Sequence, residues 1–295
     1  MCPLSAPETV MPSWGGRPRI MGVLNATPDS FSGDGLAGDL DALLARAQAQ
    51  VSEGAEILDV GGESTRPGAT PVPAEEERRR VVPVIEHLAH RVTVPLSIDT
   101  TKPAIADEAL AAGATILNDV SGLRDPELAA VATRHGAWLV LTHNGWTIPL
   151  RRDPGPRPEG VLEEVVEHLR LLVRRAMDAG VEQRRLIVDP GLGFGKTPGE
   201  SLELLKCTGE LHERLAPCPL LIGASRKSFI GRALGLPVTE RLEGSLACAA
   251  LAAFAGAEII RVHDVQPSVR AARMAWAVRQ GRAAELAPAE SVEPR

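Results

Sequence analysis

Polar side chains that could bind a small molecule follow short apolar runs along the 295-residue sequence. Asp99, Asn118 and Asp189 each lie at the end of such a run, and Lys227 follows another. If the runs are strands around one interior, these side chains converge there, and the buried carboxylates need partners such as the Lys227 ammonium. Carboxylate, amide and ammonium groups together suit a flat heterocycle with both donors and acceptors on its edge.

A second set of side chains has the chemistry of an anion site. Asn25 follows the first apolar run, and Arg261 and His263 lie at the end of the last one. The guanidinium group offers a planar fork of donors that matches phosphate oxygens. Because His263 lies beside Arg261, we interpret it as a ligand group rather than a packed structural histidine. Three other aspartates are expected to cap turns or helices: Asp119, Asp125 and Asp264.

The apolar runs alternate with longer amphipathic stretches, which is the pattern of a parallel sheet with crossover helices. The expected strands are 19–24, 56–60, 95–99, 115–119, 137–142, 186–189, 220–223 and 258–262. The expected helices are 39–53, 74–91, 103–112, 126–135, 159–179, 200–215, 242–255 and 267–280.

Eight complete units favour an α/β fold with a single (β/α)₈ TIM barrel, whose active site lies at the C-terminal ends of the strands. An open doubly wound sheet is the alternative, but no G-x-G-x-x-G run follows the first strand. We expect the barrel to span 19–282, between a flexible N-terminal segment, 1–18, and a flexible C-terminal tail, 283–295.

Composition excludes several classes of protein. The net charge is −6 and no basic stripe is present, so nucleic acid is not expected as a partner. No apolar run is long enough to cross a membrane, and the N-terminus lacks the apolar stretch of a signal peptide. The four cysteines have no C-x-x-C spacing and are expected to be free thiols, which predicts a cytoplasmic protein.

Seven motifs together resemble those of the dihydropteroate synthases, the pterin-binding folate-pathway enzymes that sulfonamides inhibit. The resemblance covers nearly the whole chain, from about residue 20 to residue 265. The motifs are Gly22–Ser32, Asp59–Gly68, Ser97–Thr100, Asn118–Gly122, Asp189–Lys196, Ser225–Gly231 and Arg261–Val265.

The resemblance implies a transferase that joins 4-aminobenzoate to (7,8-dihydropterin-6-yl)methyl diphosphate and releases diphosphate. It further implies Mg²⁺ as cofactor, with Asn25 as a metal ligand, and a homodimer. The pterin would be held by Asp99, Asn118, Asp189 and Lys227. The diphosphate would be held by Asn25, Arg261 and His263, which with Lys227 would have the catalytic roles. The aminobenzoate pocket would be formed by Thr65, Arg66, Pro67, Phe194, Lys227 and Ser228, with Phe31 closing over it.

Two segments depart from the family pattern. In the first loop, Gly33-Asp-Gly-Leu36 replaces a more usual Ser-Asp-Gly-Gly run. After the fifth expected strand the chain reads Thr142-His-Asn-Gly-Trp146, and Thr142 stands where a methionine would pack on the pterin face. This change could weaken stacking, or Trp146 could offset it. A catalytically inactive pterin-binding paralogue is therefore one hypothesis that stays open. A pterin-dependent methyltransferase is another, but it would not need the Arg261/His263 anion site, and the pterin-edge residues argue against an unrelated sugar-phosphate barrel enzyme.

Overall fold

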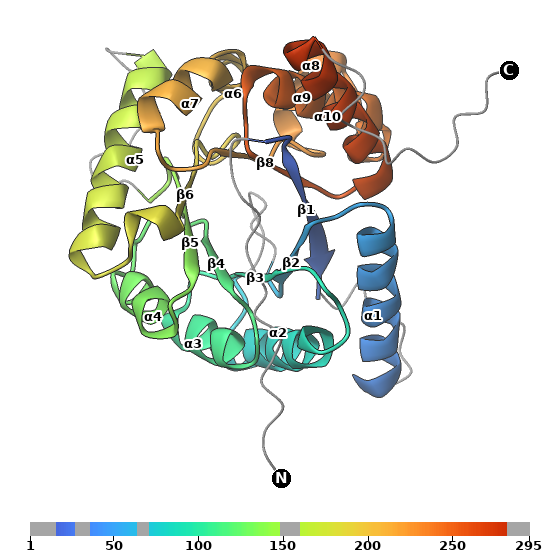
Figure 1. Ribbon diagram of the computed structural model, residues 1–295, viewed down its shortest axis with the longest axis vertical. Coiled ribbons are helices and arrows are strands. Elements are labelled where there is room, and N and C mark those ends of the chain that lie inside the picture. The colour runs from blue at the N-terminus through green and yellow to red at the C-terminus, as the bar shows by residue number, and fades with distance from the viewer. Residues whose placement is uncertain (1–15, 27–35, 64–70, 148–159, 282–295) are drawn as a thin grey trace, which may run out of the picture.

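The computed structural model describes residues 16–26, 36–63, 71–147 and 160–281. Eight parallel strands form one sheet in the order β6-β5-β4-β3-β2-β1-β8-β7. A bridge between Val188 and Leu220 joins β6 to β7, so the sheet closes into a barrel. Figure 1 shows the strands at the centre and the helices around them. The predicted (β/α)₈ barrel is therefore confirmed.

The strands lie within about two residues of the predicted ranges. Their bounds are β1 Arg19–Asn25, β2 Ile57–Gly61, β3 Leu96–Asp99, β4 Ile116–Asp119, β5 Trp138–Thr142, β6 Leu186–Asp189, β7 Leu221–Ile222 and β8 Ile259–Val262. Because the strands are parallel, all their C-terminal ends meet at one mouth of the barrel.

The helices differ from the prediction in two places. The helix expected over 200–215 is two helices, which meet at Cys207, and the Thr208 hydroxyl donates to the Leu205 carbonyl there. A short helix that begins at Ser228 was not predicted. The helices are α1 Leu36–Ser52, α2 Ala74–Ala89, α3 Pro103–Ala111, α4 Glu127–His135, α5 Gly160–Asp178, α6 Pro198–Lys206, α7 Thr208–Leu215, α8 Ser228–Leu234, α9 Leu242–Ala255 and α10 Val265–Gln280.

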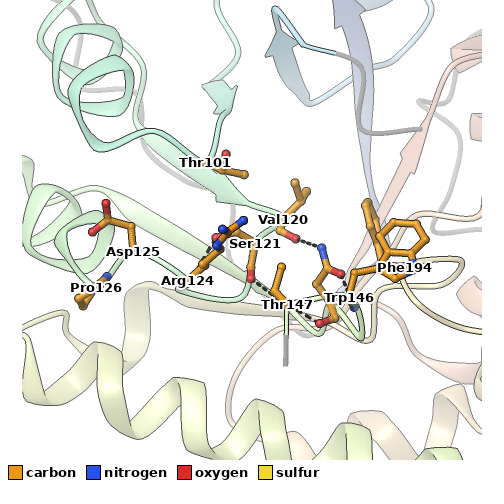
Figure 2. A pocket seen from close by; sticks show the side chains of 10 residues that line it. Thr101, Val120, Ser121, Arg124, Asp125, Pro126, Trp146, Thr147 and Phe194 are labelled. Atoms are coloured by element: carbon orange, nitrogen blue, oxygen red, sulfur yellow. Dashed lines mark hydrogen bonds between the residues drawn. The ribbon is translucent and has the colours of Figure 1, made fainter. Parts of the chain in front are cut away.

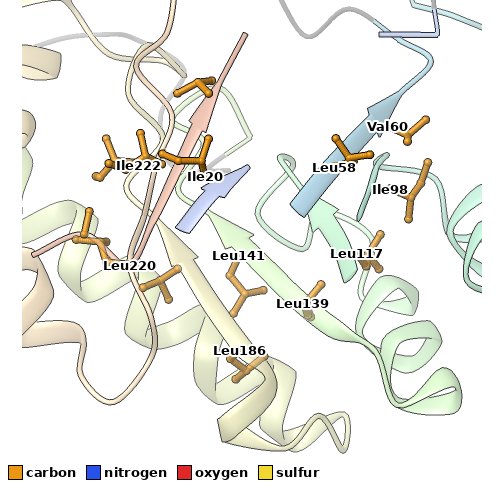
Figure 3. Close-up of a cluster of buried hydrophobic side chains, with 14 of the residues drawn as sticks. Ile20, Leu58, Val60, Ile98, Leu117, Leu139, Leu141, Leu186, Leu220 and Ile222 are labelled. Atoms are coloured by element: carbon orange, nitrogen blue, oxygen red, sulfur yellow. The ribbon is translucent and has the colours of Figure 1, made fainter. Parts of the chain in front are cut away.

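Buried apolar side chains form two separate clusters. The larger cluster joins the outward faces of the strands to the surrounding helices, and Figure 3 shows Leu58, Leu117 and Leu139 among its members. The smaller cluster fills the inside of the barrel and is called the inner floor here. Its members are Met21, Ile57, Ile116, Val140, Ile187, Leu221 and Ile259.

Strand alternation places a polar layer directly above this floor. Side chains two residues apart on a strand point to the same face. On five strands the residue two positions after a floor residue is polar, and Asp99 joins these residues because it pairs in register with Asn118. We call the six residues the polar layer: Asp59, Asp99, Asn118, Thr142, Asp189 and Arg261. The fold thus supplies an apolar base with hydrogen-bonding groups at the mouth.

Candidate active site

An arginine bound to two carboxylates lies at the centre of the mouth. Arg261 Nε lies 2.6 Å from Asp59 Oδ2, and Arg261 Nη2 lies 2.8 Å from Asp99 Oδ2. Asn118 Nδ2 donates to the same Asp59 oxygen at 3.1 Å. The network therefore joins β2, β3, β4 and β8 across the barrel.

Asp59 was not among the predicted site residues. Its side chain is fully buried, yet it binds both Arg261 and Asn118. The sequence did contain a signal, because a charged residue stands in the middle of the otherwise apolar strand Ile57–Gly61. A carboxylate at an inward strand position must have a partner inside the barrel.

The charges in this network shift one another's pKa values. Burial, reinforced by the charge of Asp59, raises the pKa of Asp99 to about 7, although Arg261 opposes the shift. Burial alone would lower the pKa of Arg261, but the charges of Asp59 and Asp99 outweigh it and raise the pKa. Arg261 thus stays charged, while Asp99 can change its protonation state near neutral pH.

A second carboxylate–cation set lies across the mouth at β6 and β7. Asp189 Oδ1 accepts a hydrogen bond from the Gly191 amide at 2.7 Å, and Lys227 Nζ donates to the Leu192 carbonyl at 2.5 Å. Burial raises the pKa of Asp189, and the charge of Lys227 opposes this shift. Burial likewise lowers the pKa of Lys227 to about 8, despite the charge of Asp189. The two groups interact electrostatically without forming an ion pair.

The loop after β6 carries an aromatic ring between a cation and an indole. Lys227 Nζ lies 4.6 Å from the centroid of the Phe194 ring. The Trp146 and Phe194 rings meet edge to face, with centroids 6.0 Å apart. Both rings line a cavity of about 510 Å³, together with Ser121, Arg124 and other residues of the β4 and β5 loops. Figure 2 shows the two rings side by side at one end of this cavity.

Lys196 fastens this loop to the loop after β5. Its Nζ donates to the carbonyls of His143, Gly191 and Phe194 at 2.9–3.1 Å, and lies 2.9 Å from His143 Nδ1. Burial and the charge of Lys196 lower the pKa of His143 to about 3, so the imidazole is neutral and its Nδ1 can accept. The loops also touch directly, since a Cβ added to Gly195 would lie 2.6 Å from the Gly145 carbonyl carbon. The ring of Phe194 therefore projects from a braced segment.

The remaining predicted residues of the described chain lie at neighbouring strand ends. Asn25 ends β1, next to Gly61 of β2, and its amide side chain makes no hydrogen bond to the described residues. His263 follows β8, and its Nδ1 lies 3.1 Å from Ser225 Oγ. Ser228 is exposed at the start of α8. Phe31, Thr65, Arg66 and Pro67 lie outside the described residues.

The three aspartates expected to be caps behave differently. Asp119 accepts from the backbone amides of Ser121 and Leu123, and Asp125 accepts from the amide of Glu127 at the start of α4. Asp264 does not cap α10. Its carboxylate instead pairs with both Nε and Nη2 of Arg226, so that prediction was wrong.

Two absences apply to the described part of the chain only. Within it, no three or more histidine, cysteine, aspartate or glutamate side chains are grouped so as to hold a metal ion. No helix in the same ranges is sufficiently long and apolar to cross a membrane.

Comparison with known proteins identifies the family. Residues 21–263 match the model of the pterin binding enzyme family. The dihydropteroate synthase of Bacillus subtilis strain 168 is 44% identical over 260 residues, which is 86% of each chain.

The chain belongs to this family. It is a dihydropteroate synthase by homology, a transferase of folate biosynthesis. Solved structures of the family agree with its fold. A dihydropteroate synthase from Clostridium difficile, crystallised in the presence of pteroic acid, has a TM-score of 0.84 at 40% identity and covers 91% of this chain and 99% of its own. A Xanthomonas albilineans dihydropteroate synthase with 4-aminobenzoic acid has a TM-score of 0.81 at 43% identity and covers 89% and 93%.

Proposed function

We propose that the mouth of the barrel joins 4-aminobenzoate to (7,8-dihydropterin-6-yl)methyl diphosphate and gives 7,8-dihydropteroate. The observation that carries this proposal is the polar layer, in which carboxylates, an amide and an arginine meet above an apolar floor. The floor and the layer suit a flat, polar-edged ring better than a flexible chain, because the donors and acceptors lie in one shell.

The pterin is assigned to Asp99, Asn118, Asp189 and Lys227. The 2-amino-pyrimidinone edge presents two parallel N–H donors, which a carboxylate such as Asp189 can accept together. The Lys227 ammonium donates to acceptors of the ring, and it lies close enough to Asp189 for their charges to interact.

The diphosphate is assigned to Asn25, Arg261 and His263. Arg261 uses Nε and Nη2 for its carboxylates, while Nη1 makes no hydrogen bond to the described residues and the side chain is 22% exposed. This nitrogen can therefore donate to a phosphate oxygen without breaking the network. The Asn25 amide oxygen, a hard ligand, fits Mg²⁺, which takes most of its ligands from phosphate and water.

Departure of diphosphate is the step that the site must assist most. The C–O bond to diphosphate breaks, the amine nitrogen of 4-aminobenzoate forms the new C–N bond, and that nitrogen then loses a proton. The conjugated pterin can delocalise positive charge on its methylene carbon, while Arg261 stabilises the leaving group. Mg²⁺, when bound, would supply further positive charge there. An arylamine is neutral at pH 7, so the reaction needs no strong general base.

The aminobenzoate is assigned to Thr65, Arg66, Pro67, Phe194, Lys227 and Ser228, with Phe31 closing over it. Among these residues the support from geometry is greatest for Phe194, whose ring is held between Lys227 and Trp146. An aromatic face held in this way offers a stacking or edge contact to a benzoate ring.

The homodimer interface is assigned to the outer face of α9 and α10. Leu251, Phe254, Met274 and Val278 are all more than half exposed on these two helices, which pack against each other. Exposed large apolar side chains on two packed helices favour a protein partner, and a second copy is the simplest one. Phe254→Asp should yield monomers in light-scattering measurements of mass, whereas a dimer that survives this change would exclude this face.

A cytoplasmic location is also part of the proposal, and the free thiols Cys207, Cys218 and Cys248 are compatible with a reducing compartment.

A turnover assay with dihydropterin diphosphate, Mg²⁺ and 4-aminobenzoate tests the reaction. We expect dihydropteroate and diphosphate to form in equal amounts. Asp189→Ala should abolish pterin binding, whereas Arg261→Ala should impair the diphosphate-dependent step and leave part of the free-pterin affinity. Pterin binding without turnover by the wild-type protein would instead indicate an inactive paralogue.

A further inference from the structure

We propose that Thr142 is a pterin-binding residue of this chain and that its hydroxyl hydrogen-bonds to the ring. The inference rests on the proposed function, in that it places the pterin in the polar layer.

The position of Thr142 points its side chain to the site. It is the last residue of β5, and its register partner on β6 is Asp189. Val140, two residues earlier, belongs to the inner floor, so alternation directs Thr142 to the barrel interior. The Cγ2 methyl of Thr142 faces the β6 loop, because a Cβ added to Gly191 would lie 3.1 Å from it. The methyl group thus makes the contact with the β6 loop, and the hydroxyl is left for a different neighbour.

The Thr142 hydroxyl lacks a partner although it is completely buried. The residue has no exposed surface, and its Oγ1 makes no hydrogen bond in the described part of the chain. A buried hydroxyl without a partner destabilises a protein, and native structures rarely retain one without a reason. Because the hydroxyl is enclosed in the unliganded chain, a ligand would supply the missing partner by displacing the side chains that cover it.

The chemistry of the neighbouring groups indicates what that partner is. Asp59 Oδ1 and Asp99 Oδ1 are also buried without partners in the described ranges, but an ionised carboxylate only accepts. Thr142 can donate, and it lies beside the carboxylate assigned to the two N–H groups of the pterin. On a 2-amino-pyrimidinone edge those N–H groups are flanked by acceptors, one ring nitrogen and one carbonyl oxygen. We infer that Thr142 donates to one of these acceptors.

Thr142→Val tests the inference, because it removes only the hydroxyl. Two effects of opposite direction are expected. The affinity for 6-hydroxymethyl-7,8-dihydropterin, measured by calorimetry, should fall about 3- to 10-fold, as for loss of one neutral hydrogen bond. The unliganded protein should become more stable, with its unfolding midpoint raised by roughly 2–4 °C. Thr142→Ser, which keeps the hydroxyl, should retain wild-type affinity.

The chain offers a matched control in Thr115→Val. The Thr115 hydroxyl is likewise buried without a partner among the described residues, but it lies just before β4, at the opposite end of the barrel. This variant should gain stability and keep its pterin affinity. Equal affinity losses in both valine variants, or unchanged affinity in Thr142→Val, would overturn the inference. A fall in the stability of Thr142→Val would also overturn it, since the hydroxyl would then have a protein partner.

The Asp189→Ala variant separates this inference from the proposed function. If Asp189→Ala loses pterin affinity and Thr142→Val does not, only the role of Thr142 fails. If Asp189→Ala binds the pterin as well as wild type does, the placement of the pterin in the polar layer is itself wrong.

Discussion

Replacement of Asp59 by asparagine should weaken the protein and its site together. The change removes one negative charge from beneath Arg261, whose Nε lies 2.6 Å from Asp59 Oδ2. Loss of one partner of a buried ion pair costs about 3–5 kcal/mol of folding free energy, and a hydrogen bond to a charged group contributes about 1.5–3 kcal/mol. Asp99 still neutralises Arg261, and asparagine keeps the shape of the side chain. We therefore expect a loss of folding free energy within the lower of these two ranges, about 2–3 kcal/mol.

Chemical unfolding of the unliganded protein measures this loss. A second effect should accompany it, because the charge of Asp59 contributes to the raised pKa of Asp99. In Asp59→Asn the pKa of Asp99 should fall below about 7, which a pH titration of pterin binding would detect. Asp107→Asn is the control, since it removes an aspartate from an exposed pair with Arg134 and should change stability little. Stability within about 0.5 kcal/mol of wild type in Asp59→Asn would refute the reasoning.

Three further variants or conditions test the geometry of the mouth. Pterin affinity should rise with pH through about 7, where Asp99 ionises and can accept, and fall through about 8, where Lys227 loses the proton that it donates; a flat titration curve would contradict both assignments. Lys196→Met should lower the unfolding free energy by about 1–2 kcal/mol and raise the KM for 4-aminobenzoate, because the bond to the Phe194 carbonyl is lost. An unchanged KM would separate Lys196 from the site. Trp146→Ala should raise the same KM about 2- to 10-fold while pterin affinity stays constant, since Phe194 loses its edge-to-face contact; equal effects on both substrates would argue against a specific role for the indole.

Much of the fold could be predicted from the sequence because each strand carries its own signal. Short apolar runs between amphipathic stretches located all eight strands to within about two residues, and the polar residues at the ends of most runs indicated the mouth. The break at Cys207 could not be predicted in this way, because Glu200–Leu215 has a helical pattern on both sides of it. Hydrophobic periodicity also does not predict the hydrogen bond that the Thr208 hydroxyl donates to the Leu205 carbonyl.

The site could be predicted only in part. Strand ends placed Asp99 and Asn118 in one predicted set and Arg261 in another, but the sequence could not show that Arg261 binds both Asp99 and Asp59, which lies 202 positions from it. Likewise, Asp264 had the local pattern of a helix cap, and its actual partner, Arg226, comes from the neighbouring β7 loop. Contacts between distant segments depend on barrel closure, which local patterns do not describe.

The arrangement of floor and polar layer has a consequence for laboratory evolution. Apolar replacement of Thr142, or joint replacement of a buried ion pair by apolar residues of similar volume, is expected to make the free protein more resistant to heat. The same changes remove groups that the ligand requires. A library selected for heat resistance alone would therefore enrich inactive barrels, and a durable catalyst is better sought among the side chains between the strands and the outer helices, such as Leu58 and Leu117.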